Sequence, residues 1–286
     1  MASFKSILIP IDFSEPSRNA LKYGLTLADQ FGAKVVVAHV VPESEKRKHT
    51  DDAIRQEIHA FMPMQNPAWS NARIVIRAGH IEAELLGIAA EEGVDLVVMG
   101  THGRRNPGRW FIGSVTEHML RKVPVPVLTV SHHDSQQHTA DYVALKRILY
   151  MTDRSESSDK GLRYAAELAR ATGAQLTMMH AIYYPDRALW APGGIPDLEE
   201  ERVSIADEMR KSAEAIAPGF SVETLVVEGR PFEKILETAG ERGMDVIVLN
   251  LQSKSTVERA FLGSTAERVV RLSPVPVLSI PLVSAT

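Results

Sequence analysis

The chain has 286 residues, of which 44% are hydrophobic and 24% charged, and its net charge is −4. This composition is typical of a globular protein, and so small a charge disfavours nucleic acid or a membrane surface as the main ligand. Because there is no cysteine, disulfides, thiol catalysis and cysteine zinc sites are excluded, and we expect a cytoplasmic protein. The length predicts two domains.

The first half alternates strand-like and helix-like segments. Its strand-like runs, which are near-continuous and apolar as in parallel strands buried on both faces, are residues 7–11, 34–41, 72–78, 95–99 and 125–130. A helix is expected between the first two, with Ser14 as its N-cap and Gly32 as its C-terminal stop. Five strands with four intervening helices predict an open, doubly wound α/β domain. No apolar run reaches the length needed to cross a membrane.

The second half repeats the first. The segment from Lys5 to Val41 aligns without a gap with the segment from Lys146 to Ile182, so that Asp12 matches Asp153. Further on, GVDLVVMGTHG aligns with GMDVIVLNLQS, and FIGSVTEHMLRKVPVPVLTV aligns with FLGSTAERVVRLSPVPVLSI. This similarity indicates the duplication of one domain.

The duplication sets the expected domain bounds. We expect a first domain at 1–133, a polar linker at 134–145 and a second domain at 146–286. The second half has a longer loop that begins with Tyr183 and Tyr184 and also contains a tryptophan and a glycine pair. This loop is either a lid over a ligand or a surface loop with anchoring aromatic residues, and we favour the second.

The sequence GTHGRRNPGRWFIGS connects the fourth strand to the next helix. Gly100 and Gly103 would let a ligand approach the backbone closely. Gly113 and Ser114 would open a helix whose first amides favour an anion, and Arg104 with two further arginines would neutralise phosphate oxygens. The same residues also have a simpler explanation, because Ser114 begins a capping-box pattern, S-x-x-E, and glycines form turns.

Four separate segments resemble a tandem universal stress protein, over nearly the whole chain. They are ILIPIDFSEPSRNAL, the AHVV of the second strand, the G-x2-G-x9-G-S signature and the closing VPVPVLTV. The resemblance implies two tandem doubly wound domains, each an open five-stranded parallel sheet of order 3-2-1-4-5 with helices on both faces. It also implies that the last strands pair antiparallel, so that the halves form a pseudo-dimer within the chain and a homodimer stays open.

In ATP-binding members of that family, the matching positions hold the nucleotide. The resemblance implies that Asp12 holds the nucleoside and that the backbone at Val40 contacts adenine. Ribose and phosphates, with or without magnesium, would be surrounded by Gly100, Gly103, Gly113 and Ser114. For Asp12 the alternative is a turn or cap at the strand end. Because Asn250 and Ser253 place side chains where the first half has glycine, we expect nucleotide mainly in the first half.

Three functions fit these observations. They are an ATP-binding stress-response sensor or switch, which we favour, a scaffold whose glycine loop is unused, and a slow ATP hydrolase. No Walker-type or zinc-protease motif appears, so we assign no catalytic residue and expect hydrolysis to be slow at most. His132 and His133 end the first domain and His138 lies in the linker, all without carboxylate support, which argues against a metal site. His39 and His180 lie in apolar strands and are expected to be buried and hydrogen-bonded.

Overall fold

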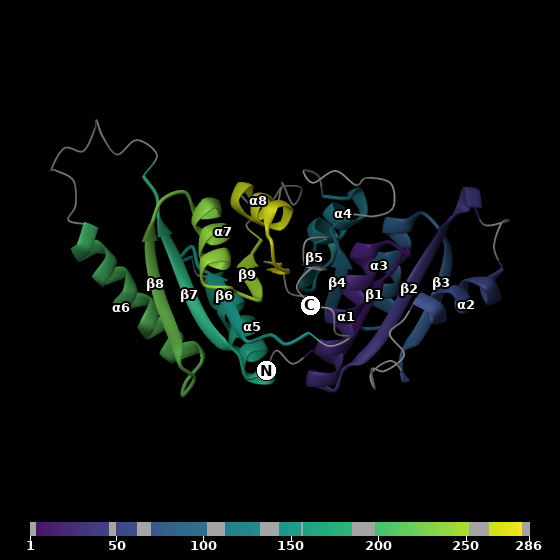
Figure 1. Ribbon diagram of the computed structural model, residues 1–286, viewed down its shortest axis with the longest axis horizontal. Coiled ribbons are helices and arrows are strands. Elements are labelled where there is room, and N and C mark those ends of the chain that lie inside the picture. Colours follow the sequence, from purple (N-terminus) through teal and green to yellow (C-terminus); the bar gives the residue numbers. More distant parts are fainter. Residues whose placement is uncertain are drawn as a thin grey trace. The chain divides into compact units, whose positions relative to one another are not determined.

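The structure is a computed structural model that describes residues 4–45, 50–61, 70–101, 112–131, 143–155, 157–184, 198–251 and 263–281 (Figure 1). The chain divides into two compact units. The first comprises Met1–Ala144 and Leu251–Thr286, and the second is Leu145–Asn250. No helix in the described ranges is both long and apolar enough to cross a membrane.

Strands and helices alternate along both units. In the first unit they are β1 (Ser6–Pro10), α1 (Glu15–Phe31), β2 (Lys34–Pro42), the 3-10 helix η1 (Glu43–Glu45), α2 (Asp51–Phe61), β3 (Arg73–Gly79), α3 (Ile81–Glu91), β4 (Leu96–Gly100), α4 (Ser114–Lys122), β5 (Val127–Val130), α8 (Ser264–Leu272) and β10 (Val277–Ile280). In the second unit they are β6 (Arg147–Met151), α5 (Ser158–Thr172), β7 (Gln175–Ile182), α6 (Leu198–Ile216), β8 (Val222–Glu228), α7 (Pro231–Glu241) and β9 (Val246–Asn250).

The strands of the first unit follow the order β3-β2-β1-β4-β5-β10. All pairs from β3 to β5 are parallel, while β10 pairs antiparallel with β5, so that Leu278 lies opposite Leu128. In the second unit the order is β9-β6-β7-β8, and every pair is parallel. The predicted doubly wound α/β fold is confirmed, and so is the predicted antiparallel pairing of the last strands.

The first strand and helix form as their residues predict. Ile7, Leu8 and Ile9 are completely buried in β1, and full burial of one such side chain contributes roughly 1.5–3 kcal/mol. Ser14 caps α1 by accepting a hydrogen bond from Ser17 N at 3.3 Å. Gly32 ends the helix with a left-handed φ of 63°, which glycine adopts at little cost. Both predicted helix boundaries are therefore confirmed.

Helices α1 to α4 of the first unit form two pairs. Arg18 on α1 donates a 2.7 Å hydrogen bond to the carbonyl of Phe61 at the end of α2, which joins these two helices. Helices α3 and α4 contact each other. Because the chain crosses from β3 back to β4 and right-handed crossovers are the rule, the second pair covers the opposite face of the sheet.

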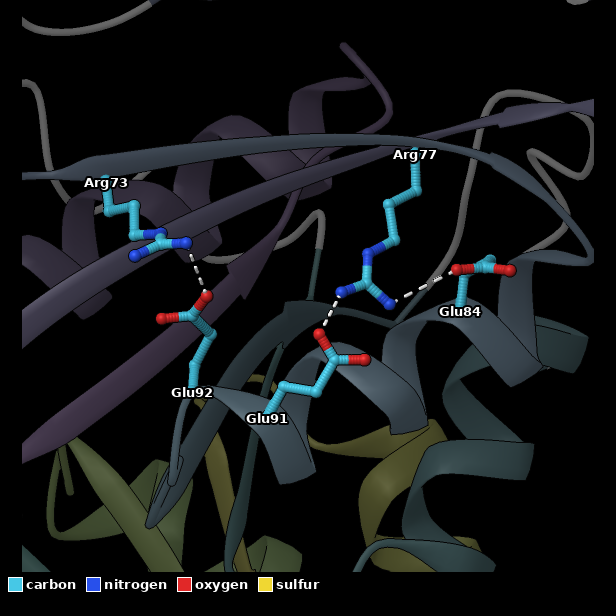
Figure 2. A network of polar contacts seen from close by, with 5 residues as sticks. All are labelled: Arg73, Arg77, Glu84, Glu91 and Glu92. Carbon is cyan, nitrogen blue, oxygen red and sulfur yellow. Dashed lines mark hydrogen bonds and ion pairs between the residues drawn. The ribbon is translucent and has the colours of Figure 1, made fainter.

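Ion pairs fix α3 to the edge strand β3 (Figure 2). Arg77 pairs with Glu84 at 3.4 Å and also with Glu91, and Arg73 pairs with Glu92 at 3.2 Å. In the second repeat, a residue of β8 and the residue after α7 form the ion pair that matches Arg73–Glu92, at 2.7 Å. There the strand carries the acidic residue and the helix end the basic one, the reverse of the first repeat.

Candidate functional site

The predicted site residues that the structure describes include Asp12 and Gly100, which lie where β1 and β4 end. These strands are parallel neighbours, with Leu8 opposite Val97. From β1 the chain builds the sheet to one side through β2 and β3, and from β4 it builds to the other side, so the strand order reverses between them. Ligands of open α/β sheets bind at the carboxyl ends of strands at such a reversal. Asp12, two residues beyond β1, and Gly100, the last residue of β4, both lie at this edge.

Asp12 is held in a tight turn. Its Oδ1 accepts hydrogen bonds from the Ser14 amide at 3.0 Å and from the Ser14 hydroxyl. Its own amide donates to Ser17 Oγ at 3.4 Å. The turn that the sequence offered as the alternative explanation is therefore present, and it also gives the carboxylate a defined orientation at the strand end.

Phe13, the next residue, has a left-handed backbone. Its φ is 63°, and Arg154 at the matching place of the second repeat has a φ of 62°. They are the non-glycine residues with positive φ in the described part of the chain. This conformation costs a residue with a side chain roughly 1–2 kcal/mol, so its surroundings must hold it. Sequence reasoning did not predict this left-handed backbone, because neither residue type favours it.

The backbone of Val40 faces the end of β1. Alternate residues of a strand direct their N–H and C=O groups toward the same neighbouring strand. The carbonyl of Ala38 accepts from the Ile11 amide at 2.8 Å, so the backbone groups of Val40 also point to the β1 side. The carbonyl of Ile11 accepts from His39 Nδ1 at 2.9 Å. His39 is half-buried and hydrogen-bonded, close to what its apolar surroundings predict.

Gly100 is required by packing, whatever the ligand. A Cβ at this position would lie 2.8 Å from Pro16 Cβ and 2.9 Å from the Pro16 carbonyl carbon, in the first turn of α1. Gly100 does not have a positive φ. Its carbonyl accepts a 2.8 Å hydrogen bond from Thr116 Oγ1, which ties α4 to the end of β4. The sequence predicted that a ligand approaches Gly100 closely, whereas in the structure the first turn of α1 makes that close approach.

Helix α4 begins without a side-chain cap. Gly113 is its N-cap residue, with an extended backbone at φ −61°, and no side chain caps the helix. Ser114 is the exposed first helical residue, so the predicted capping box is wrong. Glu117 instead pairs with Arg121. The Gly113 amide donates to the Thr101 carbonyl at 2.8 Å, which brings the amides and positive dipole of the helix start to the end of β4.

Several predicted residues lie outside the described part of the chain. These are Gly103 and Arg104 in the glycine loop, the histidines at 132, 133 and 138, and Ser253 in the second repeat. Tyr183 and Tyr184 are described, and they expose 41% and 42% of their surface. Among the described residues, no group of three or more histidines, aspartates or glutamates has an arrangement that would hold a metal ion.

In the second repeat, Asp153 occupies an analogous turn. Its Oδ1 accepts from the Ser155 amide at 3.1 Å, from the Ser155 hydroxyl at 2.6 Å and from the Ser158 hydroxyl at 2.5 Å. Burial alone would raise the pKa of Asp153, but these hydrogen bonds outweigh it and the pKa lies below its ordinary value. His180 Nδ1 donates to the Thr152 carbonyl at 3.0 Å, as His39 does to Ile11.

Asn250 takes the position in the second repeat that Gly100 takes in the first, and its side chain contacts the turn before α5. Its Nδ2 donates a 3.0 Å hydrogen bond to the carbonyl of Ser157, in the turn that leads into α5. By the alignment of the repeats, Ser157 matches Pro16, the residue that contacts Gly100. The Asn250 side chain therefore lies against the start of α5, and our expectation that it would fill the ligand's space is wrong.

Comparisons with known proteins agree on one family. The model of the universal stress protein family matches residues 3–131 and again 144–281. A universal stress protein of Mycobacterium bovis is 23% identical over 299 residues, which cover 95% of each chain. A universal stress protein of Methanocaldococcus jannaschii is 28% identical over 159 residues, 46% of this chain and 98% of the relative.

A solved structure extends this likeness to the fold. The crystal structure of a universal stress protein from Archaeoglobus fulgidus has a TM-score of 0.67 and 26% sequence identity to this chain. The match covers 97% of this chain and 98% of the other. The chain therefore belongs to the universal stress protein family and carries two of its domains in tandem.

Proposed function

We propose that this protein is an ATP-binding stress-response sensor or switch that holds its nucleotide in the N-terminal half. The observation that carries the proposal is the meeting, at the ends of β1 and β4, of the fixed Asp12 turn with the uncapped start of α4. A carboxylate that accepts hydroxyl groups and a helix start that favours an anion suit the two ends of a nucleotide.

The charges decide which end of ATP each group takes. A carboxylate repels phosphate, so Asp12 would bind the ribose or base, and only a magnesium ion would bring it near the phosphates. The amides after Gly113 would face the phosphates, where a helix start contributes about 0.3–2 kcal/mol toward an anion. The backbone of Val40, directed toward the end of β1, would contact adenine. Gly103 and Arg104 would complete the phosphate site.

The second half would bind ATP poorly or not at all. Helix α8 starts at Gly263 without a side-chain cap, as α4 does, so an anion site would remain. The loop before it carries Ser253 in place of Gly103, and a side chain there would obstruct the approach of a phosphate to the backbone. We place the domains at 1–133 and 146–286, and propose that the second serves the switch through association with partners, including a second chain, in the cytoplasm.

Titration calorimetry with ATP and magnesium tests the proposal. Wild-type protein should bind one ATP per chain, and Asp12→Ala should raise the Kd by about tenfold or more through loss of the nucleoside contact. The matched variant Asp153→Ala removes the same turn from the second repeat and should leave the Kd within about twofold. Substitution of Gly100 is unsuitable, because any side chain there displaces Pro16.

Two other results would favour the alternative functions. A folded wild-type protein that binds no ATP would contradict the proposal and favour a scaffold, which the β5–β10 pairing between the repeats also fits. Slow first-order formation of ADP under single-turnover conditions would favour the hydrolase, with Asp12 as its candidate for orienting water.

A further inference from the structure

The left-handed turn at Phe13 is held by an aromatic cluster. The Phe13 ring lies 4.8 Å from the His39 ring and 5.5 Å from the Phe61 ring, which it meets edge to face. Phe61 is 6% exposed and ends α2. The Arg18 guanidinium of α1 stacks on the Phe61 ring, 4.0 Å from its centre. Residues of β2 and α2 thus contact the Phe13 ring, and α1 contacts the ring that α2 contributes.

Both neighbours of Asp12 are held by the same strand. His39 Nδ1 donates to the carbonyl of Ile11, which precedes Asp12, while the His39 ring packs against Phe13, which follows it. The Ser14 amide closes the turn onto Asp12 Oδ1. The direction of the carboxylate is therefore set by contacts of the residues around it.

The second repeat keeps the turn and changes the anchor. Arg154 has nearly the same φ as Phe13, but its guanidinium pairs with Glu208 on α6. His180 again donates to the carbonyl that precedes the aspartate. The shared feature is a left-handed residue after an aspartate, tied by its side chain to the helix that follows the second strand of the repeat. Two chemically different anchors at one strained position indicate that the backbone conformation itself is what matters.

We propose that Phe13 is a positioning residue of the nucleotide site, whose ring, held by His39 and Phe61, keeps the Asp12 carboxylate aimed at the bound nucleoside. This inference rests on the proposed function for its ligand. It adds a route by which the docking of α2 against the loop governs nucleotide affinity, although neither Phe13 nor Phe61 is assigned a contact with ATP.

The first test measures the turn without nucleotide. In Phe13→Gly, glycine tolerates the left-handed backbone but has no ring, so the turn loses its anchor. Exchange of the Ser14 amide, followed by NMR, should become about tenfold faster, while exchange of the Ser155 amide stays unchanged. Arg154→Gly is the matched control and should give the reverse pattern. An unchanged Ser14 exchange rate in Phe13→Gly would overturn the proposal.

The second test asks whether Phe13 acts through Asp12. Phe13→Gly should raise the Kd for ATP by about tenfold in the wild-type background and by less than about twofold in the Asp12→Ala background. A role in overall folding alone would give the same factor in both backgrounds, and that result would overturn the proposal. Wild-type protein that binds no ATP would instead refute the proposed function.

A third variant tests the proposal even if the Phe13→Gly protein does not fold. Phe61→Leu keeps an apolar side chain at the end of α2, leaves the loop sequence intact and withdraws the ring that meets Phe13. It should move Ser14 exchange and the Kd in the same direction as Phe13→Gly, by about threefold. If both quantities stay at their wild-type values in a folded Phe61→Leu protein, the aromatic cluster does not position Asp12.

Discussion

Two glycines illustrate how differently one substitution acts on this chain. A Cβ at Gly100 would lie within 2.9 Å of the Pro16 backbone, whereas a Cβ at Gly240, within α7, would meet nothing within 4 Å. Gly100→Ala should therefore lower the free energy of unfolding by roughly 1–3 kcal/mol through overpacking. Gly240→Ala should raise it by roughly 0.5–1 kcal/mol, because alanine restricts the unfolded chain and favours the helix.

Unfolding in urea, followed by circular dichroism, measures both changes. If Gly100→Ala were as stable as the wild type, α1 would not pack as closely on the end of β4 as the structure shows. If Gly240→Ala were destabilised, the open space around that position would be wrong.

His180 makes stability depend on pH. Burial lowers its pKa below the ordinary value of 6.5, and the charge of Arg154 lowers it further, against the hydrogen bond to Thr152. The folded state thus binds the proton less tightly than the unfolded chain. This contribution to stability is fully present above the ordinary pKa and is lost as the pH falls through the folded pKa.

His180→Asn tests that dependence. Its amide can still donate to the Thr152 carbonyl, but it does not titrate. Between about pH 7 and about pH 5 the variant should lose less unfolding free energy than the wild type. Equal losses in the two proteins would show that His180 titrates alike in the folded and unfolded states.

At the level of single residues, the sequence predicts where the site residues lie better than it predicts why a given residue type is needed there. Asp12 and Gly100, which the sequence predicted at the site, do lie at the ends of β1 and β4. The reason for Gly100 could not be predicted, because the contact with Pro16 joins segments far apart in the sequence. The conformation of Phe13 was missed because a strained φ depends on tertiary anchors that the local sequence does not show.

At the level of elements, an exchanged ion pair gives a direct prediction. Arg73 on β3 pairs with Glu92 after α3, and Glu223 on β8 pairs with Arg242 after α7. The hydrogen bond from Arg242 lowers the pKa of Glu223, as expected for a formed pair. Either Arg73→Glu or Glu92→Arg should lower the unfolding free energy by roughly 0.5–1 kcal/mol, since each places like charges together.

The double variant should recover the loss. With both substitutions the first repeat carries the charge order of the second, and its unfolding free energy should return to within about 0.3 kcal/mol of the wild type. Urea titrations at low salt, where exposed charges interact most strongly, make the comparison. A double variant whose loss equals the sum of the two single losses would mean that the pair contributes nothing.

Most elements could be predicted from the sequence, and the main error concerns how a helix starts. Apolar runs predicted the strands because strands buried on both faces need them. The capping-box pattern at Ser114 predicted the wrong N-cap, because the hydrogen bond from the Gly113 amide to Thr101 fixes where the chain enters α4. A tertiary contact outweighed a local pattern there.

At the scale of the whole molecule, the duplication of one domain explains which features the two repeats share and which have diverged. The family resemblance predicted that the last strands, which share the segment PVPVL, would pair, and Thr129 lies opposite Val277 in that antiparallel pair. The pairing covers apolar strand edges that would otherwise promote aggregation. The hydrogen bond that His39 makes to the end of β1 is kept by His180 in the second repeat, while the loops after β4 and β9 have diverged in sequence.

We expect ATP to bind the first repeat and not the second, and amide chemical shifts measured during an ATP titration distinguish the two repeats. Saturable shifts should occur at Val40, Gly113 and Ser114. Their matched positions in the second repeat, which should not move, are Ala181, Gly263 and Ser264. Equal shifts in both repeats would contradict the asymmetry, and a folded protein with no shifts at any of these amides would contradict nucleotide binding itself.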